Sequence, residues 1–162
     1  MHTTTTIKGR ILFIEDSEAL AELYSSECRR QGYQALVAGD GRMGLRLAAE
    51  VPPDLIILDL RLPGMDGFSV LEALRTTAST RGIPVVIFSN ETGREAIERA
   101  RALGAIDYLV KSETVPSVLL GAIRRWLRTP SIARSASQRA SGGGRWIEPP
   151  KACISGVTVE TA

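Results

Sequence analysis

Histidine and cysteine are nearly absent from this sequence of 162 residues. His2 is the only histidine, and it lies in the opening segment "MHTTTTIKGR". Histidine-based catalytic triads, histidine metal sites and a phosphohistidine carrier role are therefore excluded. Cys28 and Cys153 are far apart in the sequence and lie in no metal-binding motif. We expect two reduced thiols rather than a disulfide framework.

Long apolar runs are also absent. The opening segment has no apolar stretch of signal-peptide length, and no run reaches the roughly eighteen apolar residues that a transmembrane helix requires. With 44% hydrophobic residues, the chain has enough apolar material for one core, and its length fits one domain with an appended segment. The sequence predicts a cytoplasmic protein without a membrane partner.

The charges divide the chain into two parts. Up to Ile123 there are 13 basic and 16 acidic side chains, and from Arg124 onward there are 7 basic and 2 acidic ones. The composition changes to Ser, Gly and Arg in the same region, in "TPSIARSASQRASGGGRW". We predict a folded domain over residues 1–128 and a polar, basic C-terminal tail over residues 129–162, flexible and without a recognised output domain.

The predicted tail allows a second interpretation, an electrostatic tether for nucleic acid or another acidic partner. Nothing in it resembles a helix-turn-helix, and a flexible appendage fits its few apolar residues better. Trp146 and "CISGVTV" are exceptions that could dock on the domain or on a partner. We therefore do not expect nucleic acid as a partner.

Five short apolar runs alternate with segments of helical periodicity. The runs are rich in branched aliphatic residues and read "RILFI", "QALVA", "LIILD", "PVVIFS" and "IDYLV". Helical spacing predicts helices over residues 17–31, 42–50 and 91–104. It predicts two more, one that begins near residue 66 and one that begins near residue 116 and ends before residue 130. The repeated strand and helix predict an α/β fold: a doubly wound, five-stranded parallel sheet of flavodoxin-like order 2-1-3-4-5, with helices on both faces.

The first predicted helix has a recognisable face and end. Leu20, Leu23 and Tyr24 are expected on one side of it, facing the core. Gly32 follows the helix, and we expect it to form a left-handed C-terminal cap.

Polar side chains follow the apolar runs at the sheet edge where ligands bind in such folds. Glu15 and Asp16 follow the first run, Asp59 and Ser89 end the third and fourth, and Lys111 follows the fifth. Three carboxylates in one partly buried site repel one another unless a cation compensates their charge. Oxygen ligands with solvent access favour Mg²⁺, which we therefore predict as the cofactor.

The same residues fit phosphoryl transfer. The carboxylate of Asp59 can act as a nucleophile toward a phosphoryl group without a general base. Lys111 would bind one phosphoryl oxygen, and Ser89 would donate a hydrogen bond to another. Taken singly, these residues have simpler explanations: Asp59 as an acid that caps a turn, Glu15 and Asp16 as a helix N-cap, and Ser89 and Lys111 as solvated strand ends.

These residues lie in motifs that resemble the receiver domain of bacterial two-component response regulators. The resemblance covers about the first 128 residues and rests on "ILFIEDS", "LIILDLRLPGMDGF", "VVIFSN" and "LGAIDYLVK". Because no recognised output domain follows, the single-domain type is implied. The resemblance implies a signalling switch, not an enzyme, that receives a phosphoryl group from a partner histidine kinase or phosphotransfer protein in a phosphorelay.

The resemblance also implies individual roles. Asp59 would be the phosphoacceptor, Lys111 would contact the phosphoryl group, and Ser89 with Tyr108 would form the switch pair. In such a switch two arrangements lie close in energy and the phosphoryl group binds one of them better. The implied Mg²⁺ ligands are Asp16, Asp59, the backbone carbonyl of Arg61, and Glu15 through water.

Two positions depart from the family's usual sequence. Ser112 follows Lys111 where the family usually has a proline with a cis bond, so we expect either a trans bond with a rearranged loop or a strained bond. Asn90 follows Ser89 where a small residue is usual, and we expect it to crowd the phosphoryl site or to alter attack by water.

These departures keep a second hypothesis open, a phosphorylation-independent receiver-like adaptor that binds its partner constitutively. A nucleotide or flavin enzyme of the same fold is disfavoured, because no Gly-rich phosphate loop follows the first apolar run.

A receiver without an output domain must act by binding a partner. The fourth helix, fifth strand and fifth helix carry charges of both signs, which favour a homodimer or an effector protein. A solvated helical face explains these charges equally well, since exposed ion pairs contribute only about 0–1 kcal/mol. The charged residues of this predicted face are Arg94, Glu95, Glu98, Arg101, Asp107 and Arg124.

Overall fold

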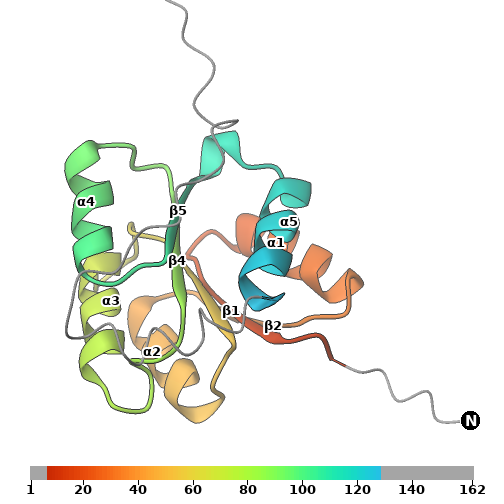
Figure 1. Cartoon of the computed structure of the whole chain (residues 1–162), viewed down its shortest axis with the longest axis horizontal. Helices are drawn as coiled ribbons and strands as arrows, with labels where there is room; N and C mark the ends of the chain where they lie inside the picture. Colours follow the sequence, from red (N-terminus) through yellow and green to blue (C-terminus); the bar gives the residue numbers. More distant parts are fainter. Residues whose placement is uncertain (1–6, 129–162) are drawn as a thin grey trace, which may run out of the picture.

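The computed structural model of the protein describes residues 7–128 (Figure 1). The predicted tail over residues 129–162 lies outside this range, so the domain boundary stays a prediction. No helix among residues 7–128 is long and apolar enough to span a membrane. The elements are β1 (Arg10–Ile14), α1 (Glu18–Arg30), β2 (Gln34–Ala38), α2 (Gly41–Glu50), β3 (Leu55–Leu58), α3 (Gly67–Thr76), β4 (Val85–Ser89), α4 (Arg94–Ala102), β5 (Asp107–Val110), the 3₁₀ turn η1 (Lys111–Glu113) and α5 (Pro116–Arg128).

The strands form one parallel sheet in the order β2-β1-β3-β4-β5. This order confirms the predicted doubly wound, flavodoxin-like fold. The strand order reverses between β1 and β3, whose register pairs Ile14 with Leu58. The residues that follow these two, Glu15 and Asp59, therefore emerge side by side at the carboxyl edge of the sheet.

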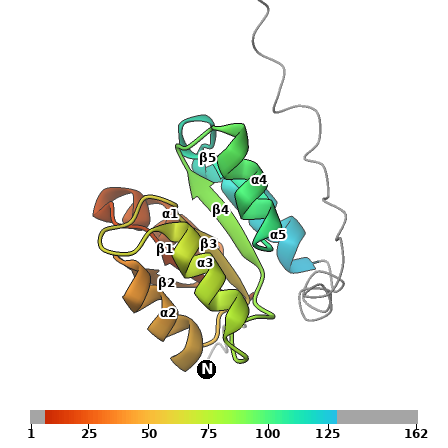
Figure 2. The same cartoon turned by 90° about the vertical axis from the view of Figure 1, so that its left-hand side faces the viewer.

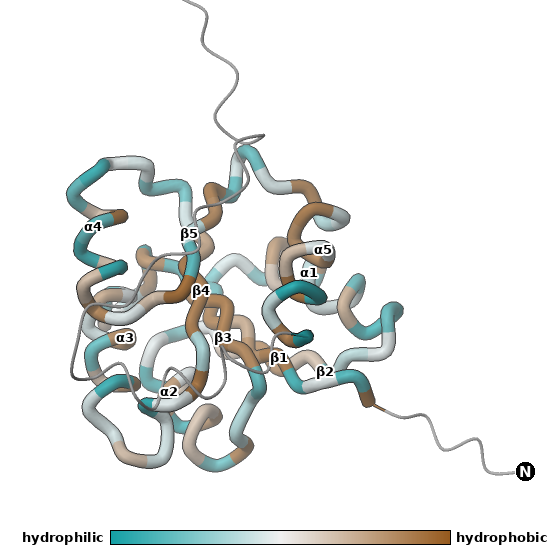
Figure 3. Tube along the Cα trace, viewed as in Figure 1, coloured by the Kyte–Doolittle hydropathy of each residue, from teal (hydrophilic) through white to brown (hydrophobic). Residues whose placement is uncertain are grey.

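Helices cover both faces of the sheet, as predicted (Figures 1 and 2). α1 and α5 lie on one face, where Tyr24 and Trp126 belong to a buried cluster with Phe88. α2, α3 and α4 lie on the other face, where Leu71 and Ala100 are buried with the alternate strand residues. Since successive side chains of a strand point to opposite faces, the inner strands are apolar except for Arg10 at the start of β1 and Ser89 at the end of β4. Figure 3 shows this hydrophobic centre along β1, β3 and β4.

Side-chain caps and glycines set the helix ends. Ser17, Asp40 and Asp66 each accept a hydrogen bond from the backbone amide three residues on, at the starts of α1, α2 and α3. Gly32 and Gly104 follow α1 and α4 with φ of 90°, in the left-handed region that disfavours side chains. The predicted left-handed cap at Gly32 is therefore confirmed.

The buried face of α1 differs from the prediction at one position. Tyr24 is buried and Leu20 packs against the same cluster, but Leu23 is 47% exposed. Each residue of a helix is rotated by about 100° from the previous one, so residues four apart share a stripe. Leu20, Tyr24 and Cys28 form that stripe, and Leu23 lies beside it.

Gly67 allows the first turn of α3 to contact the end of β3. A Cβ atom at this position would overlap the carbonyl oxygen of Asp59 and would lie 2.6 Å from the Cα of Leu60. The Gly67 amide also donates to the Leu60 carbonyl at 2.9 Å. Because backbone atoms cannot rotate aside, a larger residue would displace either α3 or the segment that carries Asp59.

We predict that Gly67→Ala lowers the free energy of unfolding by about 1–3 kcal/mol through this overlap. Gly121→Ala is the matched control, because Gly121 is an exposed residue of α5 with no neighbouring group within 4 Å of an added Cβ. The control should raise the free energy of unfolding by about 0.5–1 kcal/mol, the usual advantage of alanine over glycine in a helix. Urea denaturation measures both, and an undiminished stability of Gly67→Ala would contradict the packing described for α3.

Candidate functional site

Three carboxylates meet at the carboxyl edge of the sheet. Oxygen atoms of Glu15, Asp16 and Asp59 all lie within 4.8 Å of one another. Glu15 and Asp59 are buried, whereas Asp16 is exposed. The structure thus brings together the acidic residues that the sequence predicts at this edge and leaves one of them open to solvent.

The ammonium group of Lys111 bridges two of these carboxylates. Its Nζ lies 2.7 Å from Asp59 Oδ2 and forms a second ion pair with Glu15 Oε2. The three side chains are at most 9% exposed. Burial alone would lower the pKa of Lys111, but hydrogen bonds to Asp59 and Glu15 outweigh burial and raise the pKa above its ordinary value. Lys111 therefore stays charged and holds the two acids together.

Glu15 remains electrostatically strained despite this ion pair. Burial raises its pKa above the ordinary value, and hydrogen bonds from Lys111 and the Ser17 amide only partly oppose the increase. The nearby charge of Asp59 adds to the increase. One ammonium group thus leaves part of the negative charge of three acids uncompensated.

The donor set fits a hard divalent cation. It consists of carboxylate oxygens, and the exposed Asp16 leaves room for water on one side. Mg²⁺ prefers oxygen ligands and keeps several of its bound waters. A site that is open to solvent on one side therefore suits Mg²⁺ better than a closed site made only of protein ligands.

Hydrogen bonds fix the carboxylate of Asp59. Oδ2 accepts from Lys111, and Oδ1 accepts from the Arg61 amide at 3.2 Å. The Asp59 amide donates to the Ile14 carbonyl at 3.0 Å, which ties this residue to the end of β1. The carboxylate therefore has a defined position with the Arg61 backbone beside it, and the metal-binding role of the Arg61 carbonyl stays a prediction.

Ser89 and Tyr108 both bind the backbone of Glu91, in the loop between β4 and α4. Ser89 Oγ accepts from the Glu91 amide at 3.3 Å, and the Tyr108 hydroxyl donates to the Glu91 carbonyl at 2.5 Å. Burial and the charges of Glu91 and Asp59 raise the pKa of Tyr108 to about 12, so the hydroxyl remains a donor at neutral pH. The two predicted switch residues are thus connected through Glu91, which sequence reasoning did not single out.

The side chain of Asn90 contacts the loop that carries Lys111. Its Oδ1 accepts a hydrogen bond from the Ser112 amide at 2.9 Å, so its amide oxygen faces this loop, and the expected effect on the phosphoryl site stays a prediction. None of the peptide bonds within residues 7–128 is cis, and the Lys111–Ser112 bond is accordingly trans. The residues at this bond form the 3₁₀ turn Lys111–Glu113.

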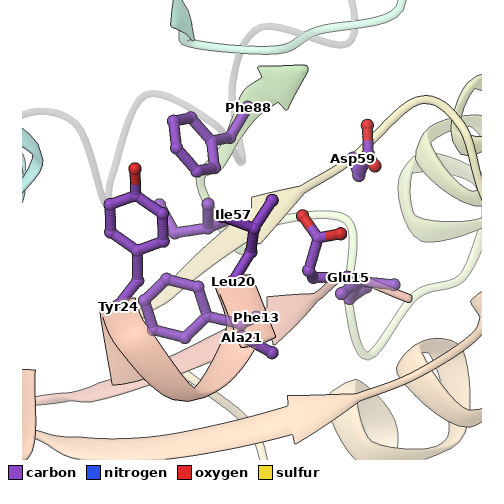
Figure 4. A pocket seen from close by; sticks show the side chains of 9 residues that line it. Phe13, Glu15, Leu20, Ala21, Tyr24, Ile57, Asp59 and Phe88 are labelled. Carbon is purple, nitrogen blue, oxygen red and sulfur yellow. The ribbon is translucent and has the colours of Figure 1, made fainter. Parts of the chain in front are cut away.

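An aromatic pocket adjoins the acids (Figure 4). It is lined by residues of β1, α1, β3 and β4, with the carboxylates of Glu15 and Asp59 at one side. Tyr24 and Phe88 contact edge to face, with ring centroids 4.9 Å apart. The Tyr24 hydroxyl donates to the Thr114 carbonyl at 2.8 Å and so connects α1 to the β5–α5 loop. Helical periodicity predicts Tyr24 in the core but does not reveal this bond.

Only some of the charged residues predicted to form a face on α4, β5 and α5 are available at the surface for a partner. Arg94 and Glu98 pair with each other on α4 at 2.8 Å. Arg124 donates instead to Gln31 of α1 at 3.1 Å. Asp107 is buried, and burial raises its pKa. The prediction was wrong in assigning Asp107 to an accessible face, because its carboxylate points toward α5.

Comparisons with known proteins agree on one family. The family model of the response regulator receiver domain matches residues 11–124. The DNA-binding response regulator MtrA of Mycobacterium tuberculosis is 36% identical over 123 residues, which are 76% of this chain and 52% of MtrA. The response regulator PleD of Caulobacter vibrioides is 35% identical over 140 residues, which are 86% of this chain and 30% of PleD. The chain therefore spans about half the length of MtrA and less of PleD.

Solved structures agree with the sequence relatives. The chemotaxis response regulator CheY4 of Vibrio cholerae has a TM-score of 0.67 and 31% identity, over 72% of this chain and 96% of CheY4. The beryllofluoride-activated receiver domain of Klebsiella pneumoniae RstA has a TM-score of 0.67 and 30% identity, over 74% of this chain and 99% of that domain. With the matching fold and acidic site, the chain belongs to the family of response regulator receiver domains.

Proposed function

We propose that this domain is a phosphorylation-dependent signalling switch with Asp59 as its phosphoacceptor. The observation that carries the proposal is the ion pair of Lys111 Nζ with Asp59 Oδ2 at 2.7 Å, next to two further acids at the switch point of the sheet. A buried, positioned carboxylate with a cation beside it is suited to attack a phosphoryl group and to keep the product's charge compensated.

In the proposed step an oxygen of Asp59 attacks the phosphorus of a phosphohistidine on a histidine kinase or phosphotransfer protein. A P–O bond forms while the P–N bond breaks, and the histidine nitrogen keeps the electron pair. Lys111 then contacts a phosphoryl oxygen in place of Asp59 Oδ2. Bound Mg²⁺ would supply charge neutralisation for the phosphoryl oxygens. Its proposed ligands are Asp16, Asp59 and the Arg61 carbonyl, with Glu15 acting through water.

The proposed switch acts through the β4–α4 loop. Ser89 would turn its hydroxyl toward the phosphoryl group and so give up the hydrogen bond that it accepts from the Glu91 amide. Tyr108 binds the carbonyl of the same residue, so a shift of Glu91 would release its ring to turn inward. Because both contacts involve Glu91, the two movements are linked, and the phosphoryl group selects one of two arrangements.

The proposed function also implies a kind of binding partner, a location in the cell and a class of protein. The domain would act by binding a protein, either an effector or a second copy of the chain, with Arg94 and Glu98 of α4 at the contact. We propose a cytoplasmic location, as expected from the sequence, and a signalling role rather than an enzymatic one. Membranes and nucleic acid are not proposed as partners.

A phosphorylation-independent adaptor is the second candidate. The observation that favours it is that Lys111 already pairs with both Glu15 and Asp59 in the unmodified protein. A domain whose lysine is already paired with two acids needs no phosphoryl group to hold that lysine, and it could bind a partner constitutively. The two candidates differ in whether modification of Asp59 changes the protein.

We predict that acetyl phosphate with Mg²⁺ adds a hydroxylamine-labile phosphoryl group to the wild type and none to Asp59→Asn, because the amide is a poor nucleophile. Intact mass spectrometry gives the readout. Asp54→Asn is the matched control, since Asp54 precedes β3 at the opposite end of the sheet and should leave labelling unchanged. Labelling of Asp59→Asn at the wild-type level would assign the phosphoacceptor elsewhere, and absence of labelling in the wild type would favour the adaptor.

Lys111→Met tests the ion cluster by leaving two buried carboxylates without their cation. We expect the free energy of unfolding in EDTA to fall by about 3 kcal/mol, and Mg²⁺ to restore part of the loss by replacing the missing charge. Urea denaturation with and without Mg²⁺ measures this, with Lys8→Met as the exposed control. The cluster would lose its assigned importance if Lys111→Met were as stable as Lys8→Met in EDTA.

Ser89→Ala separates phosphorylation from the switch. We expect labelling of Asp59 to persist, while the beryllofluoride-induced changes in the amide spectrum around Glu91 become smaller, since the hydroxyl that reaches the phosphoryl site is gone. Ser117→Ala, at an exposed position of α5, is the control. Undiminished changes around Glu91 in Ser89→Ala would argue against Ser89 as a switch residue.

A further inference from the structure

We infer that Asn90 is a positioning residue for Lys111 and acts through the backbone amide of Ser112. The inference rests on the proposed function, since it concerns the lysine assigned there to phosphoryl binding. Asn90 lies directly after β4, and Ser112 lies directly after Lys111, so a bond between them ties the lysine's loop to the neighbouring strand.

The two residues are chemically matched. Asn90 Oδ1 accepts from the Ser112 amide at 2.9 Å. A proline at position 112 has no amide hydrogen and could not donate this bond. The asparagine oxygen would then face a loop without a donor at that place. Asn90 and Ser112, the two departures from the family's usual sequence, are therefore the two partners of one hydrogen bond, and the bond needs both of them.

The remainder of the loop is held from its other end. The Thr114 hydroxyl donates to the Val110 carbonyl at 2.7 Å, and the Thr114 amide donates to the Lys111 carbonyl at 3.3 Å. The Tyr24 hydroxyl donates to the Thr114 carbonyl at 2.8 Å. These bonds connect the turn to β5 and α1, and Asn90 connects it to β4. The backbone of Lys111 is therefore held by hydrogen bonds on both sides, and its side chain extends from this fixed backbone to Asp59.

The position of the Lys111 ammonium group depends on how firmly this loop is held by the bond to Asn90. Its ammonium group must reach two buried carboxylates that follow β1 and β3, whereas its backbone lies beyond β5 on the other side of β4. A long side chain has many rotamers, so a loosened backbone would spread the ammonium group over several positions. Asn90 and Ser112 are both exposed, which keeps the expected effect of one neutral hydrogen bond modest, about two- to fivefold.

The test compares Asn90→Ala, which removes the acceptor, with Ser112→Ala, which removes the hydroxyl but keeps the amide donor. Asn90→Asp retains an acceptor oxygen and serves as the rescue variant. Three quantities are measured on the full chain: hydrogen exchange of the Ser112 amide, modification of Lys111 by an amine-acetylating reagent, and the initial rate of labelling by acetyl phosphate with Mg²⁺. The first two do not depend on phosphorylation.

For Asn90→Ala we expect faster exchange of the Ser112 amide, about two- to fivefold faster acetylation of Lys111 and a labelling rate lower by a similar factor. Ser112→Ala should match the wild type in all three, and Asn90→Asp should restore slow exchange of the Ser112 amide. Unchanged acetylation of Lys111 in Asn90→Ala overturns the inference, as does an equal effect of Ser112→Ala. If the wild type takes up no phosphoryl group, the proposed function fails, and acetylation of Lys111 decides the positioning by itself.

Discussion

The ion cluster of Lys111 with Glu15 and Asp59 is the interaction on which the rest of the site depends. Parallel pairing of β1 and β3 brings two carboxylates together at the sheet edge, where burial makes their charges costly and their repulsion strong. The backbone of the compensating Lys111 follows β5, on the far side of β4 from these acids, and its side chain reaches them with Nζ 5.9 Å from the centroid of the Phe88 ring. A change in charge at Asp59 therefore reaches the end of β5 directly.

Two routes lead from this cluster to the same loop. One runs from Lys111 through the adjacent Ser112 amide to Asn90, and the other runs from Ser89 through Glu91 to Tyr108. Both involve the segment between β4 and α4, where Asn90 and Glu91 lie. Close packing below the site supports this arrangement, because α3 contacts the backbone of Asp59 and Leu60 at Gly67 and leaves little space for that backbone to shift. In the proposed switch we therefore expect the movement to lie in the loops.

Much of the architecture is predictable from the sequence, because each strand is an apolar run and each helix has a cap or a periodic face. The acids, the hydroxyl and the lysine follow those runs, so parallel topology alone brings them to one edge. Contacts that depend on side-chain direction are not predictable in this way. Periodicity includes Leu23 in the buried side of α1, although it lies beside that side, and the charge pattern assigns the buried Asp107 to a surface. Neither anticipates that Asn90 faces the Ser112 amide. How far Leu23 and Asp107 are buried depends on how neighbouring elements pack, and the bond of Asn90 depends on loop conformation, and neither follows from a repeating pattern in the sequence.

The central claim is that the buried carboxylate of Asp59 receives the phosphoryl group. Borohydride reduction converts an aspartyl phosphate to homoserine, and peptide mass mapping then identifies the residue that was modified. After incubation with Mg²⁺ and acetyl phosphate, the account predicts homoserine at position 59. Homoserine at position 16, at another acid or at no position would contradict it.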